Sequence, residues 1–530
     1  MSDLNSGATP RYRGRLHDSL DQSALRHPSK TVISTQDRSC SFGELRVWAD
    51  SFAAHLIARG VKKGDRVGLF LENRIETVIG IFGVLKAGAV FVVVNPQTRQ
   101  DKLRYIIDDC NLRVLLTEQS LLGAVSGALT AASEVPEIIL ADLPSADSEA
   151  PFAHESRFLK DILAVPDAPF EPPSIIPSDL AALIYTSGST GTPKGVMHTH
   201  QSMTFARDSI AEYLRITPQD VMLNVLPLAF DYGLYQLLLA IELGATLVLE
   251  RSFAFPGEIL DRVERHQVTV FPGVPTLFAM LIGAHRRSSL SYPSVLRVTN
   301  TAAALPPEHI HVIREIFPNA LIFPMYGLTE CKRISYLPPE WVDAKPGSVG
   351  IPIPGTTVEI LDEEGCPVPI GERGILHVRG PHLMRGYWNN PERTARMLIP
   401  GKFLGDWVLR TGDWFRMDSD GCLYFLGRSD EVIKTRGEKV SPVEVERALA
   451  SIPGVLEAVV IGVDDDLLGQ RLKAFVVLEE GDALDVRRLR RESLIRLEPF
   501  MVPQEFELRL TLPRSPNGKV DRRGLASGSA

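Results

Sequence analysis

The chain has 530 residues, of which 44% are hydrophobic and 23% are charged, and its formal net charge is −8. One hydrophobic core stops growing near about 250–300 residues, so this length predicts two or more folding units. The acidic balance argues against a general nucleic-acid binder, because such a protein needs a basic face to neutralise phosphates.

The sequence favours a cytoplasmic protein without a membrane span. Residues 1–18 are polar and lack the apolar run of a signal peptide. The most apolar stretch, residues 78–94, is interrupted by Lys86 and three glycines and is too short to cross a bilayer. Five scattered cysteines form no C-x-x-C pair, which fits a reducing compartment better than a disulfide framework or a metal site.

Helix and strand patterns alternate in the early chain. Ser41 and Glu44 form a predicted capping box at the start of a helix that Gly60 ends. One face of this helix carries four recurring apolar residues: Leu45, Trp48, Phe52 and Leu56. Apolar strands are predicted at 65–71 and 89–94, and the same pattern recurs at 179–189, 245–250 and 268–275. Strands of this kind alternating with helices predict parallel sheets with both faces covered.

The character of the chain changes after about residue 345. Short strands separated by Gly and Pro turns predict a β-rich subdomain over about 345–427. From Arg428 the chain returns to mixed α and β, which we interpret as a small C-terminal domain. The Pro-, Ala- and Ser-rich residues 140–178 are predicted to form a surface excursion.

The most informative stretch is LIYTSGSTGTPKGVMHTH, residues 183–200. Its glycines free the backbone to point N–H groups at an anion, its hydroxyls add donors, and Lys194 adds a positive charge. This pattern suits the phosphates of ATP. It differs from the usual P-loop, because Gly195 stands where that loop has a hydroxyl residue for Mg²⁺. The alternative interpretation is a polar surface turn.

Four further segments follow in order: MYGLTE (325–330), RTGDW (410–414), GRSDEVIKTRGEKVSPVEVE (427–446) and PRSPNGKVDRRGL (513–525). Together with the loop, they resemble the signature of the adenylate-forming superfamily. That superfamily contains acyl-CoA synthetases, adenylation domains of nonribosomal peptide synthesis and firefly-type luciferases. The resemblance spans most of the chain from about residue 30 to 525.

The resemblance implies an α/β fold with a large N-terminal AMP-binding domain over 1–427. This domain would contain two sheet-and-helix subdomains and the β-rich subdomain, and a small mobile α+β domain over 428–530 would follow. The implied reaction consumes ATP with Mg²⁺. A carboxylic acid becomes an acyl-adenylate with release of pyrophosphate, and a thiol of CoA or of a carrier-protein phosphopantetheine then takes the acyl group with release of AMP.

The resemblance also assigns nucleotide-site roles. Glu330 would bind Mg²⁺, Thr329 the α-phosphate, Tyr326 the adenine and Asp413 the ribose, with Arg428 assisting. The full set of implied nucleotide-site residues is Thr186, Ser187, Gly188, Ser189, Thr190, Gly191, Lys194, Ala302, Ala303, Tyr326, Gly327, Asp413 and Arg428. Alternative interpretations are a core aromatic for Tyr326, a turn residue for Asp413 and a surface ion pair for Arg428. Ala302 and Ala303 stand where the family commonly has glycines.

In the C-terminal domain, Lys519 would bridge the incoming carboxylate and the α-phosphate. A rotation about Asp430 would then withdraw Lys519 and bring Lys434 to the thiol tunnel. Lys439 stands where the family often has Arg or Gln.

The acid pocket is predicted to contain Asp231, Tyr232, Tyr235, Asn300 and Arg333. Asp231 stands where amino-acid-activating enzymes pair the substrate ammonium, so the second hypothesis is an amino-acid adenylation enzyme that loads a free-standing acyl or peptidyl carrier protein. Alternatively, Arg333 could pair with Asp231 and leave a neutral or polar acyl pocket, or bind an acidic substrate tail. A third hypothesis, a nucleotide-binding scaffold without catalysis, conflicts with the presence of all six expected site residues: Lys194, Glu330, Asp413, Arg428, Lys434 and Lys519.

Overall fold

The computed structural model describes residues 14–142, 157–165, 171–187, 193–253, 255–301, 305–428, 431, 433–435, 438–465, 469–479, 484–514 and 519–527. The chain divides into two compact units. Unit 1 holds Met1–Phe271, Thr329–Lys332 and Pro381–Thr394, and unit 2 holds Pro272–Leu328, Arg333–Gly380 and Ala395–Ala530. Both units mix helices with sheets, which confirms the predicted α/β class.

The first sheet of unit 1 has eight strands in the order β19-β9-β8-β4-β3-β5-β6-β7. Their bounds are β3 Arg66–Phe70, β4 Val90–Val94, β5 Leu112–Thr117, β6 Glu137–Leu140, β7 Arg157–Phe158, β8 Leu180–Ser187, β9 Pro193–Thr199 and β19 Gly386–Tyr387. The strands from β8 to β7 are parallel, whereas β9 is antiparallel to both of its neighbours, β8 and β19. The parallel sheet expected from the apolar strands is therefore present.

A second group of strands in unit 1 contains β1 (Thr31–Ser34), β2 (Ser39–Ser41), β10 (Val221–Asn224) and β11 (Thr246–Leu249). β11 lies between β1 and β10 and is parallel to both, and Met222 of β10 pairs with Val270 at the start of β12 (Val270–Gly273). The helices of unit 1 are α1 Asp18–Arg26, α2 Phe42–Ala58, α3 Ile75–Lys86, α4 Gln100–Cys110, α5 Leu122–Leu129, α6 Leu159–Leu163, α7 His200–Leu214, α8 Asp231–Leu243 and α9 Pro256–His266.

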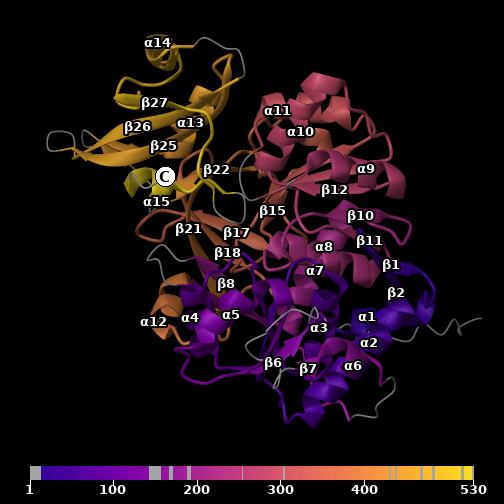
Figure 1. Ribbon diagram of the computed structural model, residues 1–530. Coiled ribbons are helices and arrows are strands. Elements are labelled where there is room, and N and C mark those ends of the chain that lie inside the picture. The colour runs from indigo at the N-terminus through magenta and orange to yellow at the C-terminus, as the bar shows by residue number, and fades with distance from the viewer. Residues whose placement is uncertain are drawn as a thin grey trace, which may run out of the picture. The chain divides into compact units, whose positions relative to one another are not determined.

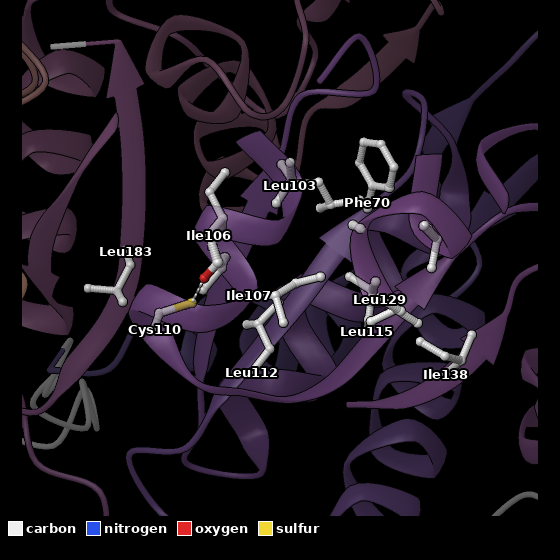
Figure 2. Close-up of a cluster of buried hydrophobic side chains, with 14 of the residues drawn as sticks. Phe70, Leu103, Ile106, Ile107, Cys110, Leu112, Leu115, Leu129, Ile138 and Leu183 are labelled. Atoms are coloured by element: carbon white, nitrogen blue, oxygen red, sulfur yellow. Dashed lines mark hydrogen bonds between the residues drawn. The ribbon is translucent and has the colours of Figure 1, made fainter. Parts of the chain in front are cut away.

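A buried apolar cluster joins the parallel sheet to α4 and α5 (Figure 2). Leu115 of β5 and Ile107 of α4 are among its fully buried members, and Leu183 brings β8 into the same cluster. The Cys110 thiol donates to the Ile106 carbonyl at 2.9 Å and so satisfies its one polar group. This cluster fixes the position of β8, the strand that leads into the phosphate loop.

Unit 2 contains the parallel strands β13 (Arg297–Asn300) and β14 (Leu321–Tyr326). β15 (Ser335–Tyr336) pairs antiparallel with β14 and with β16 (Ile351–Pro352). The helices of unit 2 before the C-terminal segment are α10 Pro275–Ser288 and α11 Pro307–Ile316, and α12 Pro391–Met397 runs across the boundary between the units. An antiparallel sheet follows, in the region predicted to be β-rich. Its strands are β17 Thr357–Leu361, β18 Gly374–Arg379, β20 Leu398–Pro400, β21 Trp407–Met417 and β22 Leu423–Arg428.

The C-terminal segment of unit 2 contains a five-stranded sheet with helices beside it (Figure 1). The strands are β23 Ile433–Thr435, β24 Glu438–Val440, β25 Val455–Asp465, β26 Gly469–Leu478 and β27 Glu505–Arg509. The helices are α13 Pro442–Ala450, α14 Val486–Arg496 and α15 Arg522–Ser527. The core of this segment lies between the sheet and its helices, with Val445 and Leu489 fully buried.

Several local predictions are confirmed in atomic detail. Ser41 caps α2: its hydroxyl accepts from the Glu44 N–H, and the Glu44 carboxylate accepts from the Ser41 N–H at 2.8 Å. Gly60 and Gly88 follow their helices with φ of +79° and +72°, in the left-handed region that favours glycine. Among the described residues, the helices lack the length and apolar character needed to span a bilayer.

Candidate active site

The predicted phosphate loop lies between two antiparallel strands of unit 1, β8 and β9. Thr186 of β8 stands opposite Lys194 of β9, and Ser187 stands opposite Pro193. The predicted loop residues Gly188, Ser189, Thr190 and Gly191 lie outside the described residues, as does the Ser187 side chain. The Thr186 hydroxyl is buried without a hydrogen-bond partner in the described part of the chain. Such a donor fits a ligand that supplies an acceptor, since buried hydroxyls are normally satisfied.

Close packing explains the glycine that follows Lys194. A Cβ at Gly195 would lie 3.0 Å from the ring of Tyr185 and 3.3 Å from Trp388. The Tyr185 hydroxyl donates to the Asp109 carboxylate, which fixes that ring. A side chain at position 195 would therefore push on a fixed tyrosine. The packing of the strand favours glycine over the P-loop hydroxyl residue at this position.

Lys194 lies in a three-residue polar cluster inside unit 1. Its Nζ donates to Glu330 Oε1 at 2.7 Å and to the Tyr387 hydroxyl at 2.9 Å. The Tyr387 hydroxyl in turn donates to the same Glu330 oxygen at 2.6 Å. Lys194 Nζ also lies 4.6 Å from the centre of the Tyr387 ring, within cation–π range. We call Lys194, Glu330 and Tyr387 the lysine–glutamate–tyrosine cluster.

The cluster keeps Glu330 ionised. Burial alone would raise the pKa of this carboxyl, but the Lys194 charge and the hydrogen bonds from Lys194 and Tyr387 hold the pKa below its ordinary value. Burial and the Glu330 charge both raise the pKa of Tyr387, so its hydroxyl stays protonated and remains a donor. A carboxylate that is ionised yet enclosed is suited to a hard cation.

His198 orients the backbone beside Glu330. Its Nε2 lies 2.9 Å from the Thr329 carbonyl oxygen, and the ring is completely buried. Burial, followed by the Lys332 charge, lowers the pKa of His198 well below its ordinary value. The imidazole is therefore neutral, and the carbonyl partner assigns its proton to Nε2.

Asp231 pairs with Lys332, which the sequence analysis had not considered. Lys332 Nζ lies 2.7 Å from Asp231 Oδ1, and the two side chains are only 1% and 12% exposed. The second oxygen, Oδ2, is buried without a hydrogen-bond partner among the described residues. Burial lowers the pKa of Lys332, although Asp231 opposes that shift. Lys332 has φ of +64°, a backbone conformation uncommon for a residue with a side chain.

Two features hold Asp231 at the start of α8. Gly233 lets the helix approach the preceding loop, because a Cβ there would lie 2.5 Å from the Pro227 carbonyl oxygen. Asn73 braces that loop: its side chain donates to the Leu226 carbonyl at 2.9 Å and accepts from the Leu228 N–H at 3.0 Å. The N-terminus of a helix also favours a negative charge such as Asp231.

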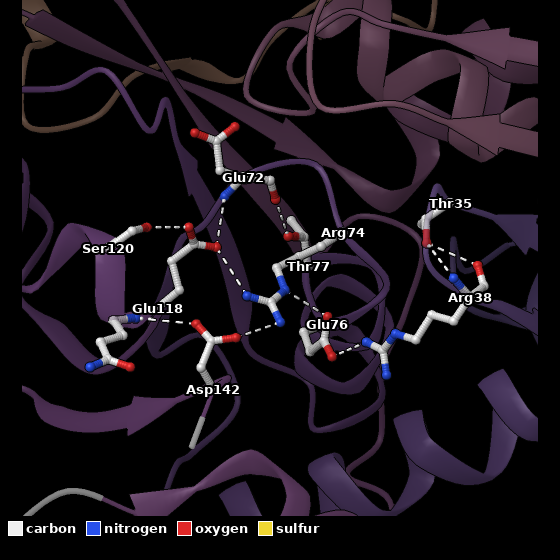
Figure 3. A network of polar contacts seen from close by, with 10 residues as sticks. Thr35, Arg38, Glu72, Arg74, Glu76, Thr77, Glu118, Ser120 and Asp142 are labelled. Carbon is white, nitrogen blue, oxygen red and sulfur yellow. Dashed lines mark hydrogen bonds and ion pairs between the residues drawn. The ribbon is translucent and has the colours of Figure 1, made fainter. Parts of the chain in front are cut away.

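An ion-pair network fixes the segment that carries Asn73 (Figure 3). The adjacent Arg74 pairs with three carboxylates: Glu76 at 2.7 Å, Glu118 at 3.2 Å and Asp142 at 2.7 Å. Glu76 also pairs with Arg38. Because Arg74 is largely buried and multiply paired, the network has a structural role in supporting the loop before Asp231.

A second group of predicted residues lies in unit 2. The Tyr326 hydroxyl donates to Asp413 Oδ2, and Arg428 Nε lies 3.7 Å from Asp413 Oδ1. The Tyr326 ring packs against Phe415 and Phe425, with centroids 4.8 and 5.9 Å apart. Asp413 and Arg428 are register partners on β21 and β22. The aromatic packing suits the core interpretation of Tyr326, and the same ring edge carries the Asp413 contact.

The other residues predicted for the acid pocket are buried. Tyr232 and Tyr235 lie on α8, and the Tyr235 hydroxyl donates to the Met203 carbonyl of α7 at 3.3 Å. Asn300 ends β13, and Arg333 lies in unit 2, 4% exposed. Inside unit 1, Asp231 forms its ion pair with Lys332. The alternative pairing of Asp231 with Arg333 stays a prediction.

Lys519 is exposed in the C-terminal segment, and the next residue, Val520, forms an isolated bridge with Arg514. Arg514 also donates to the Thr276 hydroxyl of α10 at 2.9 Å and pairs with Glu457 at 2.6 Å, both within its own unit. Lys434 and Lys439 are register partners on β23 and β24, and their side chains lie outside the described part. Ala302, Ala303 and the predicted hinge Asp430 also lie outside it.

Sequence reasoning missed Tyr387, Lys332 and His198. Tyr387 lies on the two-residue strand β19, which pairs with β9. The available signal was its surroundings, RGYWNN (385–390), where a glycine and polar residues flank two aromatics. Lys332 stands directly beside the Arg333 that was considered.

Two family models match the sequence. The model described as AMP-binding enzyme matches residues 20–388, and the model described as AMP-binding enzyme C-terminal domain matches residues 444–519. The first match contains the segments at 183–200 and 325–330, and the second contains most of the segment at 513–525. Residues 410–414 and most of 427–446 lie between the two matches.

Individual relatives cover nearly the whole chain. It is 33% identical to a long-chain-fatty-acid–CoA ligase of Bacillus subtilis (strain 168), over 96% of this chain and 94% of the relative. It is 34% identical to the phosphinothricin tripeptide synthetase PhsC of Streptomyces viridochromogenes, over 97% of this chain but only 45% of that longer protein. The crystal structure of the anthranilate CoA ligase AuaEII with anthranoyl-AMP is similar, with a TM-score of 0.88 and 28% identity over 97% of both chains.

Proposed function

The chain belongs to the AMP-binding enzyme family, and from this premise we propose that its substrate is a polar carboxylic acid that carries a hydrogen-bond donor. The general reaction follows from the family and its acyl-CoA ligase relatives. The protein is an AMP-forming acid–thiol ligase: it converts the acid with ATP into an acyl-adenylate and then into a thioester.

In the first half-reaction, Lys194 binds phosphates of ATP and Glu330 binds the Mg²⁺ that accompanies them. Lys194 leaves the carboxylate to hold the β- and γ-phosphates, and Tyr387 keeps Glu330 in place. The donor set fits Mg²⁺, because Glu330 supplies one ionised carboxylate. Mg²⁺ in nucleotide enzymes is commonly bound by one or two carboxylates plus phosphates. When bound, it neutralises charge on the phosphate oxygens.

In unit 2, Asp413 accepts from the ribose hydroxyls and Arg428 assists, while Tyr326 supports adenine and positions Asp413. Lys519 stabilises the charge that develops between the carboxylate and the α-phosphate. A rotation about Asp430 would replace Lys519 by Lys434 for the thiol step, which separates two incompatible chemistries in time. These assignments rest on the family motifs together with the contacts within unit 2.

The Asp231–Lys332 pair carries the substrate proposal. A long alkyl chain beside a buried ion pair gains nothing from these charges and leaves their polar atoms unsatisfied. A substrate ammonium, amide or hydroxyl would instead donate to Asp231 Oδ2, which has no hydrogen-bond partner among the described residues. Lys332 would in turn accommodate an acceptor on the same acid. The proposed acid is therefore polar.

The same free oxygen favours one specific candidate, an amino acid whose ammonium binds Asp231. The ammonium would complete a lysine–carboxylate–ammonium arrangement in which the carboxylate faces two cations. The acceptor would be the pantetheine thiol of CoA or of a carrier protein, since the relatives include both a CoA ligase and a peptide synthetase.

A substrate panel tests the proposal. ATP–pyrophosphate exchange is measured with amino acids, dicarboxylic acids, aryl acids, and saturated fatty acids of increasing length. The highest kcat/KM is expected for an amino-bearing or otherwise polar acid. Highest kcat/KM for long fatty acids would contradict the proposal while leaving the ligase reaction intact.

A further inference from the structure

The C-terminal helix α14 presents an exposed surface of unusual composition. Arg487, Arg488 and Arg491 are exposed and lie beside Leu494 and Ile495, which are 55% and 72% exposed. At 100° per residue these five side chains share the half of the helix opposite the buried Leu489 and Ser493. We call these five residues the arginine face.

Within the described residues, the side chains of the three arginines differ from their neighbours in having no partner. Arg496, on the same helix, pairs with Glu492 at 2.7 Å, and Arg490 donates to the Gln504 carbonyl. The side chains of Arg487, Arg488 and Arg491 make no ion pair or hydrogen bond with the described residues. In that part of the chain they therefore add no contact that would hold the C-terminal segment together.

Folding gives no reason for this arrangement. Arg487 and Arg491 are four residues apart and Arg488 and Arg491 three apart, and like charges at these spacings destabilise a helix. Two bulky apolar side chains in water add no stability either. The face is also basic on a chain whose net charge is −8. This positively charged surface costs stability, and its charge is opposite to the net charge of the protein. A negatively charged partner explains it best.

We propose that the arginine face docks an acidic carrier domain whose pantetheine thiol receives the acyl group. This inference rests on the proposed function, since it selects the carrier over CoA as acceptor. In the step served by docking, the thiol sulfur forms a bond to the acyl carbonyl carbon. The bond between that carbon and the phosphate oxygen breaks, AMP leaves with the electron pair, and the thiol proton passes to solvent.

The chemistry of the face suits a folded acidic surface. Each guanidinium offers a planar fork that pairs with a carboxylate through two hydrogen bonds. Leu494 and Ile495 add apolar contact area on either side of Arg491, and arginine is enriched in protein interfaces. An anionic bilayer would also attract arginines. However, two apolar side chains make a much smaller insertion surface than membrane-binding helices present.

Binding of the full-length protein to two holo carriers, one acyl carrier protein and one peptidyl carrier domain, tests the proposal without requiring the acid. The variant combines Arg487→Glu with Arg491→Glu, and Arg496→Gln on the same helix is the matched control. For the carrier that binds, the double variant should raise Kd about tenfold or more, and the native Kd should rise with salt. The control should match the native protein. Pyrophosphate exchange and acyl transfer to free pantetheine should stay within about twofold for both variants, because the catalytic groups are untouched.

Equal carrier binding by native and double-variant protein would overturn the proposal. Acylation of CoA with neither carrier bound would also overturn it, although the proposed acid activation would stand. Sedimentation with phosphatidylglycerol vesicles tests the alternative partner, an anionic membrane. If the double variant lost vesicle binding but kept carrier binding unchanged, the arginine face would be a membrane-binding surface. Conversely, salt-dependent carrier binding that the double variant loses would support the proposal even if no polar acid were activated.

Discussion

At the scale of single residues, the site depends on a buried carboxylate that one charged and one neutral partner hold in place. Glu330 remains ionised in a buried position because Lys194 and the Tyr387 hydroxyl both contact it. Motif reasoning identified Lys194 and Glu330, because charged residues carry the chemistry of phosphate. It did not identify Tyr387, whose role depends on contacts with Glu330 and Lys194, which lie 57 and 193 positions away in the sequence.

The variant Tyr387→Phe tests this positioning role. Removing the hydroxyl takes away a hydrogen bond that lowers the pKa of Glu330, so that pKa should rise. A hydrogen bond to a charged group contributes about 1.5–3 kcal/mol, so the acid limb of the activity profile should move up by about one pH unit. The Mg²⁺ concentration needed for half-maximal exchange should also increase.

Tyr424→Phe serves as the control, because that hydroxyl donates to Asp418 at 3.2 Å in the β-rich sheet. Its pH profile and Mg²⁺ requirement should match the native protein. A Tyr387→Phe variant with lower activity but an unshifted acid limb would show that Tyr387 is merely structural.

At the scale of elements, the apolar and capping patterns were sufficient for much of the fold. The Ser41–Glu44 box, the helix it begins and the buried strands β3 and β4 were all predictable, because each is encoded in a few adjacent residues. β19 was not predictable. A two-residue strand has no periodicity, and its pairing with β9 is set by tertiary packing. The left-handed backbone at Lys332 gave no signal either, since lysine has no preference for it.

Leu183→Ala tests whether the apolar cluster positions the phosphate loop. Leu183 is completely buried on β8, so truncation should leave a cavity and reduce stability by about 2–5 kcal/mol. Thermal unfolding should begin several degrees lower, and KM for ATP should rise because β8 loses its anchor. Leu404→Ala, at a fully exposed leucine, should change neither value. Lower stability with an unchanged KM for ATP would show that the apolar cluster stabilises the protein without positioning the loop.

At the scale of the whole molecule, buried neutral histidines predict acid sensitivity. Burial lowers the pKa of His200 to about 4, and its Nδ1 accepts from the Leu16 N–H at 3.0 Å. Because the unfolded chain binds this proton near pH 6.5 and the native state only near pH 4, stability falls as the pH is lowered through that interval. The loss from this residue approaches about 3 kcal/mol.

His200→Asn keeps an acceptor near Nδ1 but cannot be protonated. The fall of the unfolding temperature between pH 6.5 and 4 should therefore be smaller in the variant than in the native protein. An equally steep fall in both proteins would assign the acid sensitivity to other groups, such as the buried His17 and His198.

The most direct test of the account measures pyrophosphate exchange with the best amino acid of the panel and with its deamino analogue, in native protein and in Asp231→Asn. A buried group built to accept a hydrogen bond discriminates strongly against a substrate that lacks the donor. The native protein should therefore prefer the amino acid by about a hundredfold or more in kcat/KM, and Asp231→Asn should reduce that preference to within about tenfold. An unchanged preference in the variant, with nucleotide binding intact, would contradict the role of Asp231 in recognising the acid.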